Sequence, residues 1–254
     1  QYAREILTPE FGEGRGGVVE FRQEDLRGIL NGVDYEQWNT DENPHLPTHY
    51  SADDLTGKQQ CKNMLQRQLG LPAIKAPLYA TVSRLAHQKG IDVLVEALEV
   101  ILCENNIQVV ILGSGEKWLA QKIRGLQDEH PDSLRFIEGY DNSMAHRIEA
   151  GADFFVMPSR FEPCGLNQLY SLRYGTLPIV HGVGGLEDTV IDAVQTSGNG
   201  FKFYGLNPGN LINAIRRSIN LYYEQADKLH LLRDTGMRQD FSWDRAISEY
   251  KTIF

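Results

Sequence analysis

Between residues 77 and 205, short apolar runs alternate with amphipathic stretches. Residues 77–85 form a nearly continuous apolar run typical of a buried strand, and residues 90–105 carry apolar positions three and four apart, which predicts a helix. A second helix is predicted up to Pro131, and further strands are predicted at residues 107–115, 134–140, 153–159 and 177–182. Repeated strand–helix units with buried strands predict an α/β fold with a doubly wound parallel sheet.

The two ends of the chain follow a different pattern. Residues 1 to about 75 are polar, with one short strand candidate at residues 27–34, and so long a stretch with little structure is unusual inside a compact domain. Residues 241–254 predict an amphipathic helix with Ser242 as its N-cap. Its apolar face needs a surface to pack on, and we expect both ends to belong with a partner domain absent from this chain. That face consists of Trp243, Ala246, Ile247, Tyr250, Ile253 and Phe254.

Composition narrows the class of protein. The hydrophobic fraction of 41% is that of an ordinary globular protein, and the net charge of -9 argues against a general nucleic-acid binder. Because the apolar stretches are far shorter than a bilayer span and no leader opens the chain, neither a transmembrane helix nor a secretory signal is expected. Cys61, Cys103 and Cys164 form no CxxC pair, so we expect no disulfide framework or zinc site, and a reducing, cytoplasm-like compartment.

The loops after the strands carry the candidate chemistry, because ligands of open α/β sheets bind beyond the carboxyl ends of the strands. The loop after residues 77–85 holds Arg84 and Lys89 close to a helix N-terminus, which suits a phosphate or diphosphate. A solvated basic loop is an equally simple interpretation of these two residues. Glycine-rich turns at residues 112–116 and 181–190 are weaker signals of the same kind.

The strongest signal is the stretch SRFEPCGLNQL at residues 159–169. Pro163 fixes the chain direction, and Gly165 allows the backbone to approach a ligand closely. The amides around Gly165, those of Cys164, Gly165 and Leu166, would lie at a helix start, where they can bind an anion or a sugar. Glu162 can accept hydrogen bonds from sugar hydroxyls. Four such loops on consecutive strand ends favour a binding site over simple packing.

Several segments resemble the bacterial glycogen synthases and plant starch synthases, retaining glucosyltransferases of the two-domain GT-B type. The segments are SRLAHQKGIDVLVEAL (83–98), SRFEPCGLNQLYSLRYGTLP (159–178) and GGLEDTV (184–190), while YAREILTPEFGEG (2–14) and GILNGVDYEQWN (28–39) look like the junction between the two domains. The resemblance implies three parts. Residues 1–30 would be the tail of the N-terminal domain and the start of the linker. Residues 31–240 would be the Rossmann-like, nucleotide-sugar-binding C-terminal domain. Residues 241–254 would be a helix that packs on the missing N-terminal domain.

The resemblance also implies roles for individual residues. Arg84 and Lys89 match the pair that binds the donor's diphosphate and stabilises it as the leaving group, and Glu162 matches the acidic residue that holds the transferred glucose. The remaining donor-binding positions are Tyr140, on which adenine would stack, the turn formed by Cys164, Gly165 and Leu166, and Asn167 near the phosphates.

The function implied is transfer of glucose from ADP-glucose to the non-reducing end of an α-1,4-glucan, with retention. ADP-glucose would be the donor substrate, and no cofactor or metal site is expected. The expected partners are ADP-glucose or ADP, the α-1,4-glucan acceptor and the missing N-terminal domain, with no nucleic acid and no membrane. The compartment would be the cytoplasm, or the plastid in a plant. Alone, this donor-binding half is expected to be inactive.

Two departures from the wider GT-B pattern bear on this interpretation. Many GT-B enzymes carry a second glutamate eight residues after the first, where this chain has Tyr170; the resembled bacterial synthases lack it too. The N-terminal Lys-x-Gly-Gly-Leu loop of the family has no counterpart here. Two alternatives stay open: another GT-B enzyme that uses a UDP-sugar, and a non-catalytic module that binds a nucleotide or a glucan.

Overall fold

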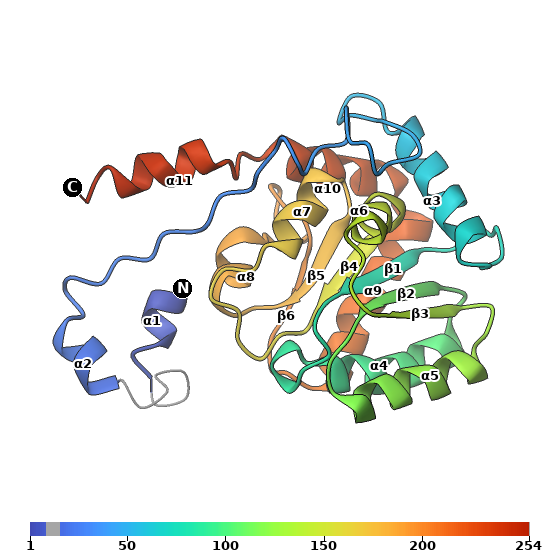
Figure 1. The fold of residues 1–254 in the computed structure, drawn as a ribbon, viewed down its shortest axis with the longest axis horizontal. Coiled ribbons are helices and arrows are strands. Elements are labelled where there is room, and N and C mark those ends of the chain that lie inside the picture. Colours follow the sequence, from blue (N-terminus) through green and yellow to red (C-terminus); the bar gives the residue numbers. More distant parts are fainter. Residues whose placement is uncertain (9–15, 254) are drawn as a thin grey trace.

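The fold is built on one parallel sheet of six strands in the order β3-β2-β1-β4-β5-β6 (Figure 1). It is seen in a computed structural model that describes residues 1–8 and 16–253. Each strand pairs in parallel with its neighbours. The strands are β1 Leu78–Val82, β2 Gln108–Gly113, β3 Leu134–Glu138, β4 Phe154–Met157, β5 Leu177–His181 and β6 Phe201–Phe203.

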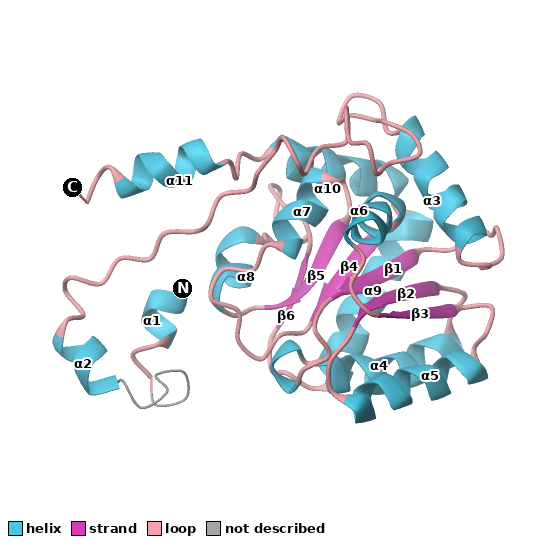
Figure 2. Ribbon diagram, viewed as in Figure 1, coloured by secondary structure: helices cyan, strands magenta, loops and turns pink. Residues whose placement is uncertain are grey.

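Helices cover both faces of this sheet (Figure 2). Those that follow the strands are a 3-10 turn η1 His87–Lys89, then α4 Ile91–Glu104, α5 Lys117–Glu129, α6 Asn142–Gly151, α7 Asn167–Arg173, α8 Gly184–Thr189 and α9 Pro208–Glu224. The others are α1 Tyr2–Glu5, α2 Gly16–Phe21, α3 Thr56–Gln68, α10 Ala226–Arg238 and α11 Trp243–Tyr250. The predicted doubly wound α/β fold is therefore confirmed.

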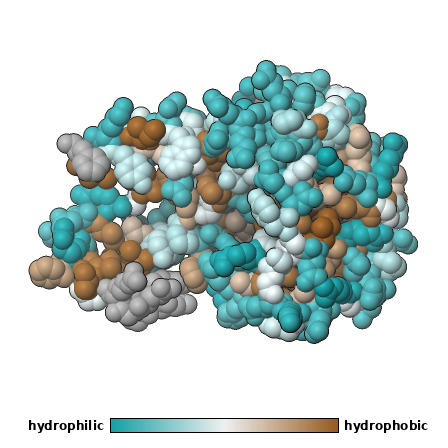
Figure 3. Space-filling model, in the orientation of Figure 1, coloured by the Kyte–Doolittle hydropathy of each residue, from teal (hydrophilic) through white to brown (hydrophobic). Residues whose placement is uncertain are grey.

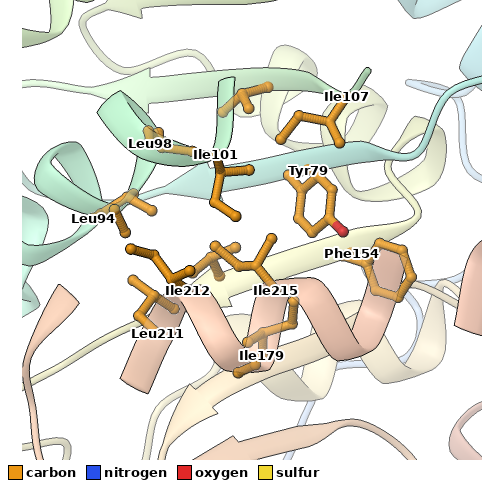
Figure 4. Packing of buried hydrophobic residues seen from close by; sticks show 14 of the residues in the cluster. Tyr79, Leu94, Leu98, Ile101, Ile107, Phe154, Ile179, Leu211, Ile212 and Ile215 are labelled. Carbon is orange, nitrogen blue, oxygen red and sulfur yellow. The ribbon is translucent and has the colours of Figure 1, made fainter. Parts of the chain in front are cut away.

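The core lies between these layers, and alternate strand residues feed its two sides. On one face of the sheet, Tyr79, Phe154 and Ile179 of the strands pack against the helices α4 and α9. The helices contribute Leu94 and Ile215 to this cluster (Figure 4). The next residues along the strands point to the opposite face, where α3, α6 and α8 supply the partners; the buried set there includes Ala80, Phe155, Val180, Leu65, Ile148 and Leu186. Both faces of the sheet are buried, which explains why the strand sequences are continuous apolar runs.

The polar N-terminal third departs from the prediction. No strand forms at residues 27–34; a single bridge between Val33 and Ser242 is all that pairs there. Instead the thirteen-residue helix α3, which the pattern did not predict, packs against α6. The edge strand β6, only three residues long, was also missed.

Helix α3 escaped prediction because it buries polar side chains. Lys58, Lys62 and Gln66 are each less than 5% exposed. Lys62 Nζ donates to the carboxylate of Asp153 at 2.6 Å, and Gln66 Nε2 donates to Gln108 Oε1 at 2.7 Å. Hydrogen bonds satisfy these groups in the interior, so no apolar stripe marks the helix in the sequence.

The C-terminal helix α11 forms as expected, with Ser242 Oγ accepting a hydrogen bond from the backbone N–H of Arg245. It extends away from the sheet beside the segment that joins α2 to Val33 (Figure 1). Ala246 is buried, but Trp243 and three further apolar side chains are 44–50% exposed: Ile247, Tyr250 and Ile253. In Figure 3, brown hydrophobic surface accordingly lies on this left-hand part of the molecule. Phe254 and residues 9–14 of the predicted domain junction lie outside the described residues, and the domain boundaries stay a prediction.

Within the described ranges, no helix is long and apolar enough to cross a membrane.

Candidate functional site

The strand order reverses between β1 and β4, and the loops that leave these two strands diverge in opposite directions. In open α/β sheets such a switch point is where ligands bind. A cavity of about 190 Å³ lies there. Its walls come from residues 81–84, Lys89 and Ile91 on the β1 side, and from residues 155–159, Glu162 and residues 165–167 on the β4 side. Six of the eight predicted site residues are thus brought together: Arg84, Lys89, Glu162, Gly165, Leu166 and Asn167.

Glu162 is the buried carboxylate of this cavity. Its Oε2 atom lies 2.5 Å from Lys89 Nζ and accepts a hydrogen bond from Ser159 Oγ at 3.2 Å. Both bonds fall on Oε2, and across residues 1–8 and 16–253 Oε1 accepts none. One oxygen therefore fixes the side chain while the other stays available as an acceptor. Ser159, which is itself buried, was not recognised as a site residue in the sequence, although it opens the SRFEPCG motif.

The glycine pair of α8 supports the backbone of Glu162. Gly185 N–H donates to the carbonyl oxygen of Glu162 at 2.9 Å. Gly184 has φ +49°, and a Cβ added there would lie 2.0 Å from that same carbonyl oxygen, so no side chain fits. The glycine-rich turn at residues 181–190 therefore supports the Glu162 turn and does not line the cavity, and its predicted contact with a ligand stays a prediction.

The turn that follows Glu162 presents unused donors. In the described part of the chain, the backbone N–H groups of Cys164, Gly165 and Leu166 donate no hydrogen bond. Gly165 has φ +69°, a left-handed conformation that favours glycine, and α7 begins two residues later. Free amides at the start of a helix are suited to bind an anion or a polar oxygen, as the sequence predicts.

The two predicted cations differ in how they are held. Lys89 ends η1 and is paired with Glu162, so their charges largely cancel. Arg84 is exposed, and its only side-chain bond among the described residues is a long one, 3.4 Å, to Gln88 Oε1. The positive charge still available to a bound anion is therefore chiefly that of Arg84.

Arg160 has a structural task, although it lies within the same motif. Its guanidinium makes a two-pronged ion pair with Asp92 in the first turn of α4, at 2.8 and 2.7 Å. The hydrogen bond and charge of Arg160 hold the pKa of Asp92 below its usual value, although partial burial acts in the opposite direction. This pair ties the β4 loop to the loop after β1 and so keeps the two walls of the cavity together.

Asn167 lines the cavity, whereas Cys164 packs beside it. Asn167 Nδ2 donates to the carbonyl oxygen of Val82 at 2.6 Å, which joins α7 to the end of β1. Cys164 does not line the cavity; its Sγ accepts a hydrogen bond from the backbone N–H of Asn31 at 3.4 Å. Burial raises the pKa of the Cys164 thiol, which opposes formation of a reactive thiolate, so Cys164 is a packing residue of the turn.

Tyr140 is set apart from the other predicted site residues. It is 85% exposed, beyond the end of β3 at the edge of the sheet, and it does not line the cavity. The adenine-stacking role stays a prediction.

Histidine and acidic side chains do not gather as metal ligands. Over residues 1–8 and 16–253, no group of three or more His, Cys, Asp or Glu side chains could hold a metal ion. His146 is buried in a stack of rings, 4.0 Å from Trp38 and 4.8 Å from His45 between centroids. Burial, helped by the charge of His45, lowers its pKa to about 4, so it is a neutral packing residue at pH 7.

Comparison with known proteins decides the family. The family described as "Glycosyl transferases group 1" matches residues 66–230. The chain belongs to the group 1 glycosyl transferases. Its curated relatives include "Glycogen synthase 1" of Geobacter sulfurreducens, 47% identical over all of this chain and 51% of the relative, and "Glycogen synthase" of Anaeromyxobacter sp., 49% identical over all of this chain and 53% of the relative. The chain therefore spans about half the length of the curated relatives it matches.

Among solved structures of this family's fold, the catalytic domain of Starch Synthase IV from Arabidopsis thaliana, bound to ADP and acarbose, superposes with a TM-score of 0.93. It is 34% identical, and the match covers 99% of this chain and 53% of that one. Anabaena HepE in complex with UDP and glucose matches with a TM-score of 0.69 at 20% identity, which shows the shared fold alone. The predicted C-terminal half of a GT-B enzyme is confirmed as the fold.

Proposed function

We propose that this chain is the donor-binding half of a glucosyltransferase that moves glucose from ADP-glucose to the non-reducing end of an α-1,4-glucan, with retention. The observation that carries the proposal is the arrangement at the switch point. Arg84, Lys89, the turn at Gly165 with its free amides, and the buried carboxylate of Glu162 line one cavity.

The chemistry follows from where charge develops. When the bond between the sugar's anomeric carbon and the diphosphate breaks, negative charge builds up on the leaving phosphate. Arg84 and Lys89 supply fixed positive charge at that place, which lowers the barrier electrostatically. Lys89 is already paired with Glu162. A bound phosphate would be the second anionic partner of Lys89, so the leaving group would lie close to the carboxylate that binds the sugar.

Glu162 would hold the transferred glucose. Its free Oε1 can accept hydrogen bonds from sugar hydroxyls, and the amides of Cys164 and Gly165 can donate to sugar or phosphate oxygens. Asn167, which lines the cavity, would lie near the phosphates, and Tyr140 would stack on adenine. Arg84, Lys89 and the amides of the Gly165 turn would bind the diphosphate without a metal ion, and ADP-glucose would act as substrate with no cofactor.

The relatives support this choice of substrate. Several are named glycogen synthase, and the similar plant structure holds ADP together with acarbose. The cavity of about 190 Å³ is smaller than the roughly 300–1,000 Å³ of ordinary ligand clefts, so a second wall is needed to enclose a nucleotide sugar. We assign that wall, and the acceptor site, to the other half of the polypeptide. The free cysteines fit a reducing compartment, which would be the cytoplasm or a plastid.

The test is a donor panel on the full-length polypeptide. Labelled ADP-glucose, UDP-glucose and GDP-glucose are offered with a glucan primer, and incorporation into the polymer is measured. We expect ADP-glucose to be used with at least tenfold higher kcat/KM than the others, a difference of about 1.4 kcal/mol, and the product to be cleaved by an α-specific exoglucosidase. Preference for UDP-glucose would favour the UDP-sugar alternative, and binding of ADP without transfer would favour a non-catalytic module.

A further inference from the structure

A buried carboxyl group lies directly behind the donor site. Glu149 is on α6, 1% exposed, where α6 faces α7 and α3. Ser171 Oγ lies 2.8 Å from Glu149 Oε2 and 2.8 Å from the carbonyl oxygen of Asn167. Asn167 is the first residue of α7 and lines the cavity. A chain of three oxygen atoms thus joins the interior to the first turn of α7.

The protons of this chain can be counted. A serine hydroxyl carries one proton, so it can donate to only one of its two oxygen neighbours. A carbonyl oxygen never donates, so the Asn167 contact is satisfied only if the Ser171 proton lies on that side. The Glu149 contact then needs a proton from Glu149 itself. An ionised Glu149 would instead accept the hydrogen bond from Ser171. Ser171 Oγ and the carbonyl oxygen of Asn167 would then lie 2.8 Å apart with no proton between them.

We propose that Glu149 is a neutral carboxylic acid that donates a hydrogen bond to Ser171, and that this bond positions the first turn of α7 for donor binding. Glu149 is a positioning residue, because it acts through Ser171 and does not touch the donor. The inference rests on the proposed function, since it concerns the same donor site.

The surroundings favour the neutral acid. Lys58 of α3 is close, but its Nζ donates to Thr176 Oγ1 at 2.7 Å and to the Ala150 carbonyl at 3.0 Å, and it forms no salt bridge with Glu149 among the described residues. Burial lowers the pKa of Lys58 to about 7. Burial raises the pKa of Glu149 to about 8, against the opposing effects of the Ser171 bond and the Lys58 charge. Three tyrosines also interact with the charge of Glu149: Tyr170 in α7, Tyr174 just after it, and Tyr50 in the loop before α3. Burial raises the pKa of all three.

The consequence reaches the donor site through Asn167. Its side chain donates to the Val82 carbonyl at the end of β1, so the same residue is held by Ser171 from behind and fastens α7 to β1 in front. Losing one such bond weakens the hold on the turn that carries Gly165 and Leu166. As the pH rises through about 8, Glu149 gives up its proton, Ser171 turns towards the carboxylate, and the affinity for the donor falls.

The protonation is tested first, on the full-length polypeptide. Infrared difference spectra of wild type minus E149Q, recorded at pH 7 in water and in D2O, should show the stretch of a protonated carboxyl group that shifts on deuteration. A carboxylate or an amide shows no such band. The exposed Glu99 provides the matched control, because E99Q should leave this band in place. Absence of a band that E149Q removes would overturn the proposal.

The positioning role is tested by kinetics of the same proteins. We expect E149A and S171A to raise the KM for ADP-glucose about two- to tenfold with little change in kcat, the worth of one hydrogen bond. E149Q, whose amide can still donate to Ser171, should stay within twofold of wild type. In wild type the KM should rise as the pH passes about 8, and in E149Q it should not.

The outcomes separate the two claims. Equal defects in E149Q and E149A, or no defect in E149A and S171A, would overturn the positioning role. A wild-type polypeptide that shows the carboxyl band but uses no ADP-glucose would overturn the proposed function and the link to donor binding, while the neutral state of Glu149 would stand.

Discussion

Replacing Arg84 with alanine is expected to lower kcat/KM for ADP-glucose about 100- to 1,000-fold in the full-length polypeptide, the usual effect of removing a group that stabilises charge in the transition state. Arg84 is the cation at the cavity that no carboxylate neutralises within the described residues, whereas Lys89 is paired with Glu162. Its charge is therefore the one most available to the departing diphosphate.

The same substitution should leave stability unchanged, because Arg84 is exposed and makes a single long hydrogen bond. Arg67 on α3 is the matched control: it is an exposed arginine that does not line the cavity, and R67A should leave kcat/KM unaltered. Steady-state kinetics and thermal unfolding of both variants give the answer. A loss of less than threefold in R84A would show that the diphosphate is not held by this residue.

Replacing Asp153 with alanine is expected to have the largest effect on stability, a loss of about 3–5 kcal/mol in the free energy of unfolding. The carboxylate of Asp153 is buried, 2.6 Å from Lys62 Nζ and 2.7 Å from Arg233 Nη2, and it also accepts the backbone N–H of Leu78 at 2.9 Å. It joins α3 and α10 to the first strand of the sheet. Removing it would leave Lys62 and Arg233 without their anionic partner.

Urea unfolding at pH 7 measures this loss, with D128A on the exposed face of α5 as the control that should stay within about 0.5 kcal/mol of wild type. The pH dependence gives a second readout. Burial alone would raise the pKa of Asp153, but Lys62 and Arg233 outweigh it and the pKa is lowered. The stabilisation is therefore present above the ordinary value of 3.8 and is lost as the pH falls through the lowered pKa. An Asp153 variant as stable as wild type would contradict the buried network.

The sheet could be predicted from the sequence because its strands are apolar on both faces. A short apolar run such as residues 107–115 is typical of a strand in a buried parallel sheet. It did not predict α3, whose buried face carries Lys58, Lys62 and Gln66. Periodicity of apolar residues cannot detect a helix that is held by hydrogen bonds and an ion pair. The prediction of a strand at residues 27–34 was wrong, because no second strand lies beside this segment. Only Val33 of the segment pairs, in an isolated bridge to Ser242.

The site was predictable to the extent that topology brings loop ends together. Arg84 and Glu162 are 78 residues apart, yet adjacent parallel strands place their loops on one cavity. What the sequence could not show is which charges pair: Lys89 with Glu162, and Arg160 with Asp92. Nor could it show that a glycine turn near residue 184 supports the Glu162 backbone. These facts depend on side-chain directions, which the order of residues along the chain does not specify.

Calorimetric titration with ADP, on the full-length polypeptide and its R84A variant, tests the central claim most directly. The account predicts that ADP binds the wild-type protein and that R84A loses this binding, with this chain alone binding ADP only weakly. Equal binding of ADP by wild type and R84A, or no binding by the full-length wild type, would contradict a diphosphate site at the ends of β1 and β4.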